Sequence, residues 1–323
     1  DNYLNEFWSN SSAESLAIIY NSISKQKKNI YIPRYFCGQS LKFLRGLSAN
    51  IIFYDIDEDF NIDYKKIDKS IKIKESDIFV VVHYFGKINN HDQLLILKSK
   101  IDFFIIEDCA HVISPYVTSN WIGDFLIFSP HKHFPLPEIG LILSKKKINY
   151  SYLGLKKVNI IWFIKQFIKK IININRSSNW GVKWSKNISL ISNNAPNKYL
   201  IRISSKYLKD FSELKVLIKK NYIKARDILK NSSNWQIVAN NDETPYGIIV
   251  RCNTLDIAKS SYYLFNNKFK LVMQWPDLPI EIKENDNNLD TIHLTNKILF
   301  FFIDHRFNNR KWIKELKKTM SVL

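Results

Sequence analysis

The sequence predicts an α/β fold: a mostly parallel central sheet flanked by helices, followed by a smaller C-terminal α+β domain. Short apolar, β-branched runs alternate with helix-like segments through the first two-thirds of the chain. One run, Ile78–His83, reads Ile-Phe-Val-Val-Val-His, as expected of a strand buried on both faces. The 323 residues exceed what one simple core needs. We expect a large domain over residues 1–205, then a linker helix and small domain over 206–323.

The N-terminal part begins with a cluster of helix-capping residues, Ser9–Ser12, ahead of an expected helix over Ala13–Ser24. The other segments that we expect to be strands here are Asn29–Pro33, Ile51–Asp55, Phe103–Glu107, Phe125–Ser129 and Leu141–Ser144. The segments with helical spacing are Gln39–Leu47, Tyr64–Ser70 and His91–Lys100. Ligands of such domains bind at the carboxyl ends of the strands.

Two lysine-rich helices are predicted next. Asn159–Ile174 has an apolar face opposite lysines, and such a helix packs on its own domain or on a partner subunit, or lies on a membrane surface. Ser204–Lys230 is predicted to be one long helix that bridges to the small domain. That domain contains strand-like runs and a last helix, which are Gly247–Cys252, Lys270–Gln274, Leu299–Ile303 and Arg310–Met320.

The net charge is unusual. Lysine and arginine number 48 against 30 acidic residues, a formal charge of +18, which favours anionic partners or follows from a general lysine bias of composition. Zinc-finger spacing, an RNP-type motif and a concentrated basic tail are absent, so we expect no nucleic-acid partner. No apolar run is long enough to span a membrane, and we expect no secretory leader. Three scattered cysteines provide neither a disulfide framework nor a metal cluster, so we expect a cytoplasmic location.

Candidate chemistry lies at the ends of two predicted strands. Asp108 follows one of them, where a buried carboxylate needs a cation or a strong donor. Lys132 follows the next, where an interior amine has a lowered pKa and can act as a nucleophile. The hydroxyl-rich Ser9–Ser12 opens a helix, and helix N-termini bind phosphate. An acid, an amine and a phosphate cradle are what pyridoxal phosphate requires, and each of these signals has an ordinary structural explanation as well.

A series of motifs in the same region strengthens this interpretation. In order along the chain they are Ile30–Cys37, Phe53–Asp57, Val82–Gly86, Ile106–His111, and Gly123-Asp124 through Ser129–Lys132. Over residues 9–145 this series resembles the DegT/DnrJ/StrS family of sugar aminotransferases, a branch of the fold type I pyridoxal-phosphate enzymes. After residue 145 only the general layout agrees.

The resemblance implies a role for each matching residue. Lys132 would bind the cofactor covalently and shuttle the proton, and Asp108 would pair with the pyridine nitrogen. His111 would touch the ring hydroxyl. Ser129 and the Ser12–Ala13 backbone would bind the phosphate. Phe36 or Cys37 would lie over the ring: the count from Pro33 favours Cys37, and aromatic stacking favours Phe36.

Some segments depart from the family pattern. The phosphate loop reads Ser11-Ser12-Ala13, without the family's glycine, and Glu14 would repel phosphate if its side chain faced inward. The substrate-binding segment is not recognisable, and Asn193-Asn194 and Arg202 are its candidates.

We expect a homodimeric aminotransferase that acts on a keto sugar, nucleotide-linked, with an amino donor such as glutamate. One alternative is a sugar dehydratase, although the resemblance implies that dehydratases of this family have a histidine in place of the lysine. The others are a non-catalytic protein that keeps the fold, and a basic protein that binds nucleic acid or a membrane surface.

Overall fold

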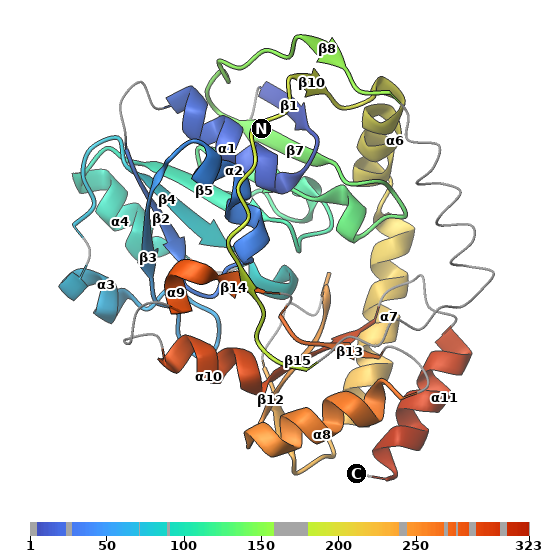
Figure 1. Cartoon of the computed structure of the whole chain (residues 1–323). Helices are drawn as coiled ribbons and strands as arrows, with labels where there is room; N and C mark the ends of the chain where they lie inside the picture. The colour runs from blue at the N-terminus through green and yellow to red at the C-terminus, as the bar shows by residue number, and fades with distance from the viewer. Residues whose placement is uncertain are drawn as a thin grey trace.

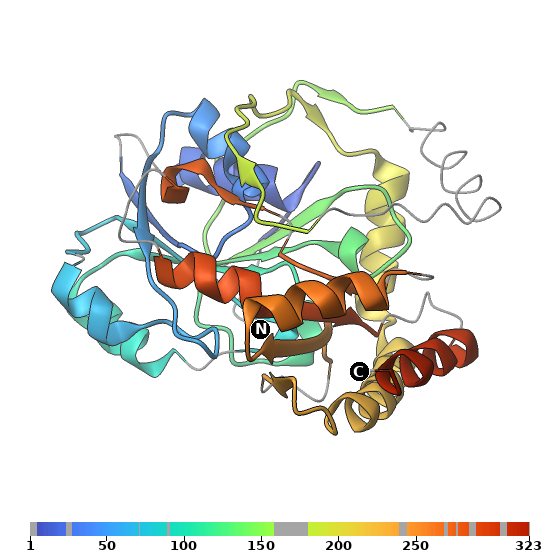
Figure 2. The same ribbon diagram turned by 60° about the horizontal axis from the view of Figure 1, so that its bottom comes forward.

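A computed structural model describes most of the chain. The described residues are 5–23, 28–70, 72–88, 91–157, 180–238, 244–267, 271–275, 277–283, 289–303 and 309–322. They form an α/β structure with the fold expected from the sequence (Figures 1 and 2). The expected amphipathic helix over Asn159–Ile174 lies outside the described residues.

The central sheet has seven strands in the order β1-β7-β6-β5-β4-β2-β3. The strands β2 to β6 are parallel, and β7 runs antiparallel to both of its neighbours. Six of the strands were predicted, because each is a compact apolar run. The seventh, β1, was not, because five residues with mixed burial give no clear alternation. The bounds are β1 (Asn5–Ser9), β2 (Asn29–Pro33), β3 (Asn50–Tyr54), β4 (Ile78–Val82), β5 (Phe104–Cys109), β6 (Phe125–Phe128) and β7 (Gly140–Ser144).

Helices cover both faces of this sheet, as β4 illustrates. Ile78 and Val80 pack in a cluster with the helix α1 (Ser12–Ile23), while Phe79 and Val81 pack with residues of the helices on the other face. Strand residues alternate between faces, so a strand apolar at every position is buried on both. The remaining helices of this part are α2 (Lys42–Gly46), α3 (Tyr64–Ser70) and α4 (Asp92–Lys100), and its 3₁₀ turns are η1 (Gly38–Leu41), η2 (Tyr84–Gly86), η3 (Pro115–Val117) and η4 (Pro130–Lys132).

The prediction of one long bridging helix was wrong. The structure has two helices, α6 (Lys198–Lys209) and α7 (Ser212–Leu229), which run one after the other along one side of the molecule (Figure 1). Asp210 leaves the helical conformation, with ψ of 55°, so the first helix ends there. The lysine-rich periodicity continues across the break, which is why the pattern read as a single helix.

A second sheet lies in the C-terminal part. Its four antiparallel strands are ordered β11-β12-β15-β13, with bounds β11 (Trp235–Ile237), β12 (Gly247–Cys252), β13 (Val272–Met273) and β15 (Ile298–Phe302). The helices here are α8 (Leu255–Phe265), α9 (Ile280–Lys283), α10 (Leu289–Lys297) and α11 (Asn309–Met320). The expected domain boundary at residues 205 and 206 falls inside α6, and it stays a prediction.

Two short parallel pairs complete the strands. They are β8 (Gly154–Leu155) with β10 (Asn194–Ala195), and β9 (Trp184–Ser185) with β14 (Leu278–Pro279). The second pair joins the C-terminal part to the large sheet, because β14 also packs on η1, where the Leu278 carbonyl lies so close to Gly38 that a Cβ there would come within 2.5 Å.

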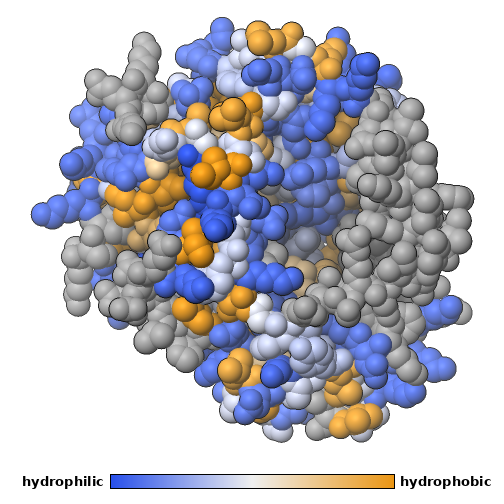
Figure 3. All heavy atoms as spheres, viewed as in Figure 1, coloured by the Kyte–Doolittle hydropathy of each residue, from blue (hydrophilic) through white to orange (hydrophobic). Residues whose placement is uncertain are grey.

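The surface carries many charged groups. Figure 3 shows hydrophilic side chains over much of one face, with apolar side chains in separate groups between them. No helix among the described residues has the length and apolar character to cross a membrane. Within the same residues, no group of three or more His, Cys, Asp or Glu side chains could hold a metal ion, and Cys37, Cys109 and Cys252 are free thiols.

Candidate active site

Asp108 lies near the carboxyl end of β5. Its Oδ1 atom accepts a hydrogen bond from the Ala110 N–H at 2.9 Å. Burial raises the pKa of the Asp108 carboxyl above its usual range, and the nearby positive charge of Lys132 and the Ala110 N–H only partly counteract that rise. The carboxyl is therefore placed to bind a cation, whose charge would hold it ionised.

Lys132 lies on the neighbouring loop, in the turn η4 directly after β6. Its backbone N–H donates to the Ser129 carbonyl at 3.0 Å, and its side chain is half-buried. β5 and β6 are adjacent and parallel, so the segments that follow them emerge at the same edge of the sheet. The side chains of Lys132 and Asp108 accordingly line the same cavity.

Most of the predicted site residues line this cavity. Its volume is about 30 Å³, and it is lined by Ser12, Phe36, Cys37, Ser40, Val82, Asp108, Ala110, His111, Lys132 and Trp275. Six of the eight residues predicted for the site line the cavity. The other two adjoin it: Ala13 follows Ser12 in the chain, and the Ser129 hydroxyl is hydrogen-bonded to that of Ser12.

The hydroxyl groups expected to bind phosphate lie together. Ser12 is the first residue of α1, and the Oγ atoms of Ser129 and Ser12 are 3.4 Å apart. The N–H groups of Ser12 and Ala13 belong to the first turn of the helix, where no intrahelical acceptor exists for them. Together these groups offer hydroxyl and backbone donors to one anion at the helix N-terminus.

The Glu14 side chain is engaged in hydrogen bonds away from the phosphate-binding groups, so it does not need to repel an anion there. Its side chain is buried, and its Oε2 accepts hydrogen bonds from the backbone and side chain of Asn10 at 2.6 and 2.9 Å. Its Oε1 accepts from the Ser192 N–H at 2.7 Å. Glu14 therefore fastens the start of α1 to the segment around Ser192.

His111 contributes a neutral ring. Its Nδ1 accepts a hydrogen bond from the Phe85 N–H at 3.2 Å, and its ring stacks on Tyr246 with centroids 4.5 Å apart. Burial, followed by the charges of Lys132 and His133, lowers the pKa of His111 well below its usual value. A neutral ring that accepts at Nδ1 has its proton on Nε2, so His111 can donate from that atom.

Phe36 and Cys37 both line the cavity, so the two alternatives for the residue over the ring stay open. The Cys37 thiol donates to Asp277 Oδ1 at 3.1 Å, and burial followed by the charge of Asp277 raises the pKa of this thiol to about 11. Cys37 is therefore a neutral side chain at neutral pH.

Trp275 is a lining residue that the sequence did not reveal. It lies just after β13, far along the chain from the other lining residues, and the Cys37–Asp277 bond spans 240 positions. No local motif surrounds it, so only the tertiary structure could identify it.

The candidates for the substrate segment lie elsewhere. The Asn194 carbonyl accepts from Asn10 Nδ2 at 2.9 Å, which places it near the start of α1. Arg202 is exposed on α6. None of the three candidates, Asn193, Asn194 and Arg202, lines the cavity around Lys132.

Behind the cavity, on the opposite side of β5 from Asp108, lies a buried pair. His83 Nε2 and Glu107 Oε2 are 2.6 Å apart, and Glu107 Oε1 accepts from the N–H groups of Ile122 and Gly123 at 2.8 and 2.6 Å. The backbone N–H of His83 also donates to the backbone carbonyl of Asp108 at 3.1 Å. This pair fixes the strand end from which Asp108 projects.

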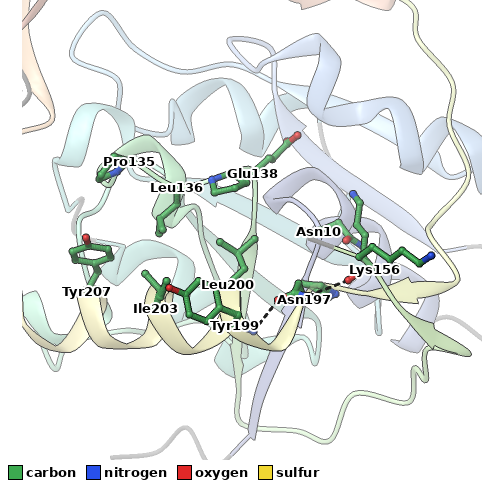
Figure 4. A pocket seen from close by; sticks show the side chains of 13 residues that line it. Asn10, Pro135, Leu136, Glu138, Lys156, Asn197, Tyr199, Leu200, Ile203 and Tyr207 are labelled. Atoms are coloured by element: carbon green, nitrogen blue, oxygen red, sulfur yellow. Dashed lines mark hydrogen bonds between the residues drawn. The ribbon is translucent and has the colours of Figure 1, made fainter. Parts of the chain in front are cut away.

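A larger pocket of about 530 Å³ lies on the outer side of the loop that follows Lys132. Figure 4 shows Pro135 and Leu136 of this loop facing Leu200, Ile203 and Tyr207 of α6, with Lys156 and Asn10 at the other end. None of the predicted site residues lines it. Its size suits a small molecule, and its walls carry Glu138, Lys156 and Lys157, but neither Asp108 nor Lys132 reaches it.

The donor set of the smaller cavity fits pyridoxal phosphate. Asp108 suits a pyridinium nitrogen, Lys132 an aldehyde, and Ser12 with Ser129 a phosphate. The cavity has room for one or two water molecules, so a ring enters only when a lining side chain such as that of the half-buried Lys132 turns aside.

Comparisons with known proteins agree with the fold and the motifs. Residues 9–150 match the model of the DegT/DnrJ/EryC1/StrS aminotransferase family, which confirms the resemblance expected from the sequence. A UDP-4-amino-4,6-dideoxy-N-acetyl-beta-L-altrosamine transaminase of Campylobacter jejuni is 29% identical over 144 residues, which are 42% of this chain and 38% of that protein. The chain thus spans about two-fifths of the length of the curated relatives that it matches.

Solved structures extend the likeness to the whole chain. Helicobacter pylori PseC, an aminotransferase of pseudaminic acid biosynthesis by its description, superposes with a TM-score of 0.71 at 12% identity, over 99% of this chain and 88% of its own. E. coli GDP-4-keto-6-deoxy-D-mannose-3-dehydratase, solved with bound hydrated PLP, superposes with a TM-score of 0.67 at 15% identity, over 98% and 88%. At such identities the likeness shows the fold, which is fold type I.

Proposed function

We propose that this chain, whose residues 9–150 match the DegT/DnrJ/EryC1/StrS aminotransferase family, is a pyridoxal-phosphate-dependent aminotransferase that acts on a keto sugar. One observation supports this most strongly: Lys132 and Asp108 line a single cavity, with the hydroxyl of Ser12 in the same wall. Amine, acid and anion donors thus face one space, although they come from three separate segments of the chain.

The bound cofactor would supply an electron sink for the carbon that exchanges its amino group. Lys132 would hold the cofactor through its amine and move a proton at the reacting carbon, as acid and base in turn. Asp108 would keep the ring nitrogen protonated. His111 would donate from Nε2 to the ring hydroxyl, which its neutral tautomer allows. Ser12, Ser129 and the Ala13 backbone would bind the phosphate.

The substrate that we propose is a keto sugar carried on a nucleotide, with glutamate as amino donor. The Campylobacter relative is named as a transaminase of a UDP-linked sugar, and that similarity supports the substrate class. The net charge of +18 would attract a diphosphate-bearing molecule. Biosynthesis of amino sugars, polysaccharides or natural products is the setting in which such a reaction occurs.

The experiment that tests this proposal is spectroscopic. The purified protein, incubated with pyridoxal phosphate and desalted, should absorb at roughly 410–430 nm, because a lysine-bound aldehyde absorbs there. Glutamate should then remove this band, and a keto sugar nucleotide should restore it. A protein that stays colourless after incubation has no aminotransferase activity of this type.

A second candidate is a protein that keeps the fold without the reaction. The small volume of the cavity, about 30 Å³, favours it. A dehydratase is the third, since a structural neighbour has that activity, but Lys132 stands where dehydratases of the resemblance have histidine. Loss of the band with glutamate and its return with a keto sugar would favour transamination over both.

We also propose a homodimer. Large apolar side chains are exposed on the segments around β8 and β10, among them Leu153 at 86% and Leu190 at 80%. These segments are joined by the hydrogen bond from the Leu153 N–H to the Asn193 carbonyl at 2.8 Å, so they form one surface. Exposed apolar groups of this kind indicate an interface.

Three free thiols support the cytoplasmic location that we propose for the protein.

A further inference from the structure

Trp275 is held in the cavity by the segment that follows it. Asp277 accepts hydrogen bonds from the Cys37 thiol at 3.1 Å and from the Gln39 N–H at 2.8 Å. The Leu278 N–H donates to the Lys183 carbonyl at 2.8 Å. The position of Trp275 relative to Cys37 is therefore fixed by side-chain and backbone contacts, and it does not depend on the packing of the indole alone.

The indole packs in an aromatic wall. Its ring lies 4.5 Å from that of Tyr35, and 5.8 Å from those of Tyr84, Phe85 and His111, measured between centroids. Only 8% of the residue is exposed. It shares the lining of the cavity with Lys132, Asp108 and Ser12.

The N–H of this indole has no acceptor among the described residues, although it is buried. Trp235 and Trp121 of the same chain do have an acceptor, since Trp235 Nε1 donates to the Leu229 carbonyl at 3.1 Å and Trp121 Nε1 to the Pro115 carbonyl at 3.0 Å, whereas Trp312 shares the lack of one within the described part of the chain. A buried donor without an acceptor costs free energy, so such groups usually have a binding partner.

We infer that Trp275 binds the ligand of this cavity, and that its Nε1–H donates a hydrogen bond to an anionic oxygen of that ligand. The inference rests on the proposed function. The Lys132 amine shares the lining of the cavity with the indole, and its positive charge suits an anion. The oxygen belongs either to pyridoxal phosphate or to the carboxylate of the amino donor.

The test compares two tryptophans whose buried indole N–H groups both have no acceptor in the part of the chain that the structure describes, and only one of the two lines the cavity. Trp275→Phe removes the N–H and keeps an aromatic ring in the cavity. Trp312→Phe is the matched control, because the Trp312 Nε1 is also buried without an acceptor among the described residues, but it lies in α11, away from the cavity. Trp275→His restores an N–H donor on a smaller ring.

Two titrations distinguish the two sources of the oxygen. In the first, pyridoxal phosphate is added to the apo-protein and the dissociation constant is read from the absorbance. In the second, glutamate is added to the loaded protein, and the concentration that removes half of the band is recorded. Trp275→Phe should weaken one of the two by roughly 10- to 100-fold, the effect of a lost hydrogen bond to a charged group.

The control variant Trp312→Phe should change neither titration by more than about twofold, the scale of substitutions away from a site. Trp275→His should recover part of what Trp275→Phe loses. A Trp275→Phe protein that folds and matches Trp312→Phe in both titrations overturns the inference and leaves the proposed function standing. A wild-type protein that never forms the band contradicts the proposed function, and this inference with it.

Discussion

The carboxyl of Asp108, near the end of β5, and the amine of Lys132, in the turn after β6, line one cavity from two neighbouring parallel strands. The positive charge of the lysine lowers the pKa of the aspartate, against a larger rise that burial causes. The acid and the amine are therefore electrostatically coupled, and a cation between them would decide the charge state of the acid.

The Asp108→Asn variant tests the role of the acid. We expect it to fold and to lose turnover by about 100-fold or more, because an amide does not hold a proton on a ring nitrogen. The measurement is the rate at which glutamate removes the visible band. Near-wild-type rates would contradict the assigned pairing.

The stability of the same variant depends on pH in a defined direction. The pKa of Asp108 is raised in the fold, so in the unloaded wild-type protein this group favours folding at pH values below the usual pKa of about 4. That contribution is lost as the pH rises toward the higher pKa of the folded state. Asp108→Asn removes this loss, and its thermal midpoint at pH 7 should equal or exceed that of the wild type. A midpoint clearly lower than the wild type would contradict this account.

His111 can be tested through its hydrogen bond to the backbone. His111→Phe leaves the buried Phe85 N–H without its acceptor and should cost about 1–3 kcal/mol of unfolding free energy, measured by denaturant titration. His111→Gln retains an acceptor and should cost less. Equal losses in the two variants would show that packing against Tyr246, rather than the hydrogen bond, determines the effect.

The buried pair behind Asp108 predicts a large effect on stability. Burial alone would raise the pKa of Glu107, but the hydrogen bond and charge of His83 and the Gly123 N–H lower it overall. Glu107 thus stabilises the fold above its usual pKa of about 4, and this contribution disappears as the pH falls through the lower pKa of the folded state.

Glu107→Gln should therefore cost about 3–5 kcal/mol of unfolding free energy at pH 7, the usual effect of breaking a buried pair. Glu58→Gln provides the control, because the Glu58 side chain is 80% exposed in its ion pair with Arg251. It should change the free energy by less than about 1 kcal/mol. Similar losses in both variants would mean that the His83 pair does not hold the strand end.

The proposed dimer surface can be tested by charge. The double variant Leu153→Lys with Leu190→Lys should shift the protein from dimer to monomer in light scattering at micromolar concentration. Val216→Lys changes a comparably exposed apolar residue on α7, at 69% exposure, and should leave the dimer intact. A wild-type monomer, or a double variant that remains dimeric, would contradict the proposed surface.

The sequence predicted the parallel sheet because its strands are short apolar runs, and the residues at the ends of these runs show where each strand stops. It also predicted that Asp108 and Lys132 would lie at the same edge of the sheet, since they come at the carboxyl ends of two neighbouring strands. The break between α6 and α7 was missed because the helical periodicity continues across it. Trp275 was missed because its place depends on long-range contacts such as the Cys37–Asp277 hydrogen bond, and periodicity contains no information about those.

The visible absorption of wild-type protein and of Lys132→Ala, each incubated with pyridoxal phosphate and desalted, tests the central claim most directly. The account predicts a band at roughly 410–430 nm in the wild type that disappears with glutamate, and no such band in Lys132→Ala. An equal band in both proteins would show that another lysine binds the aldehyde, and no band in either would contradict the assignment of this cavity.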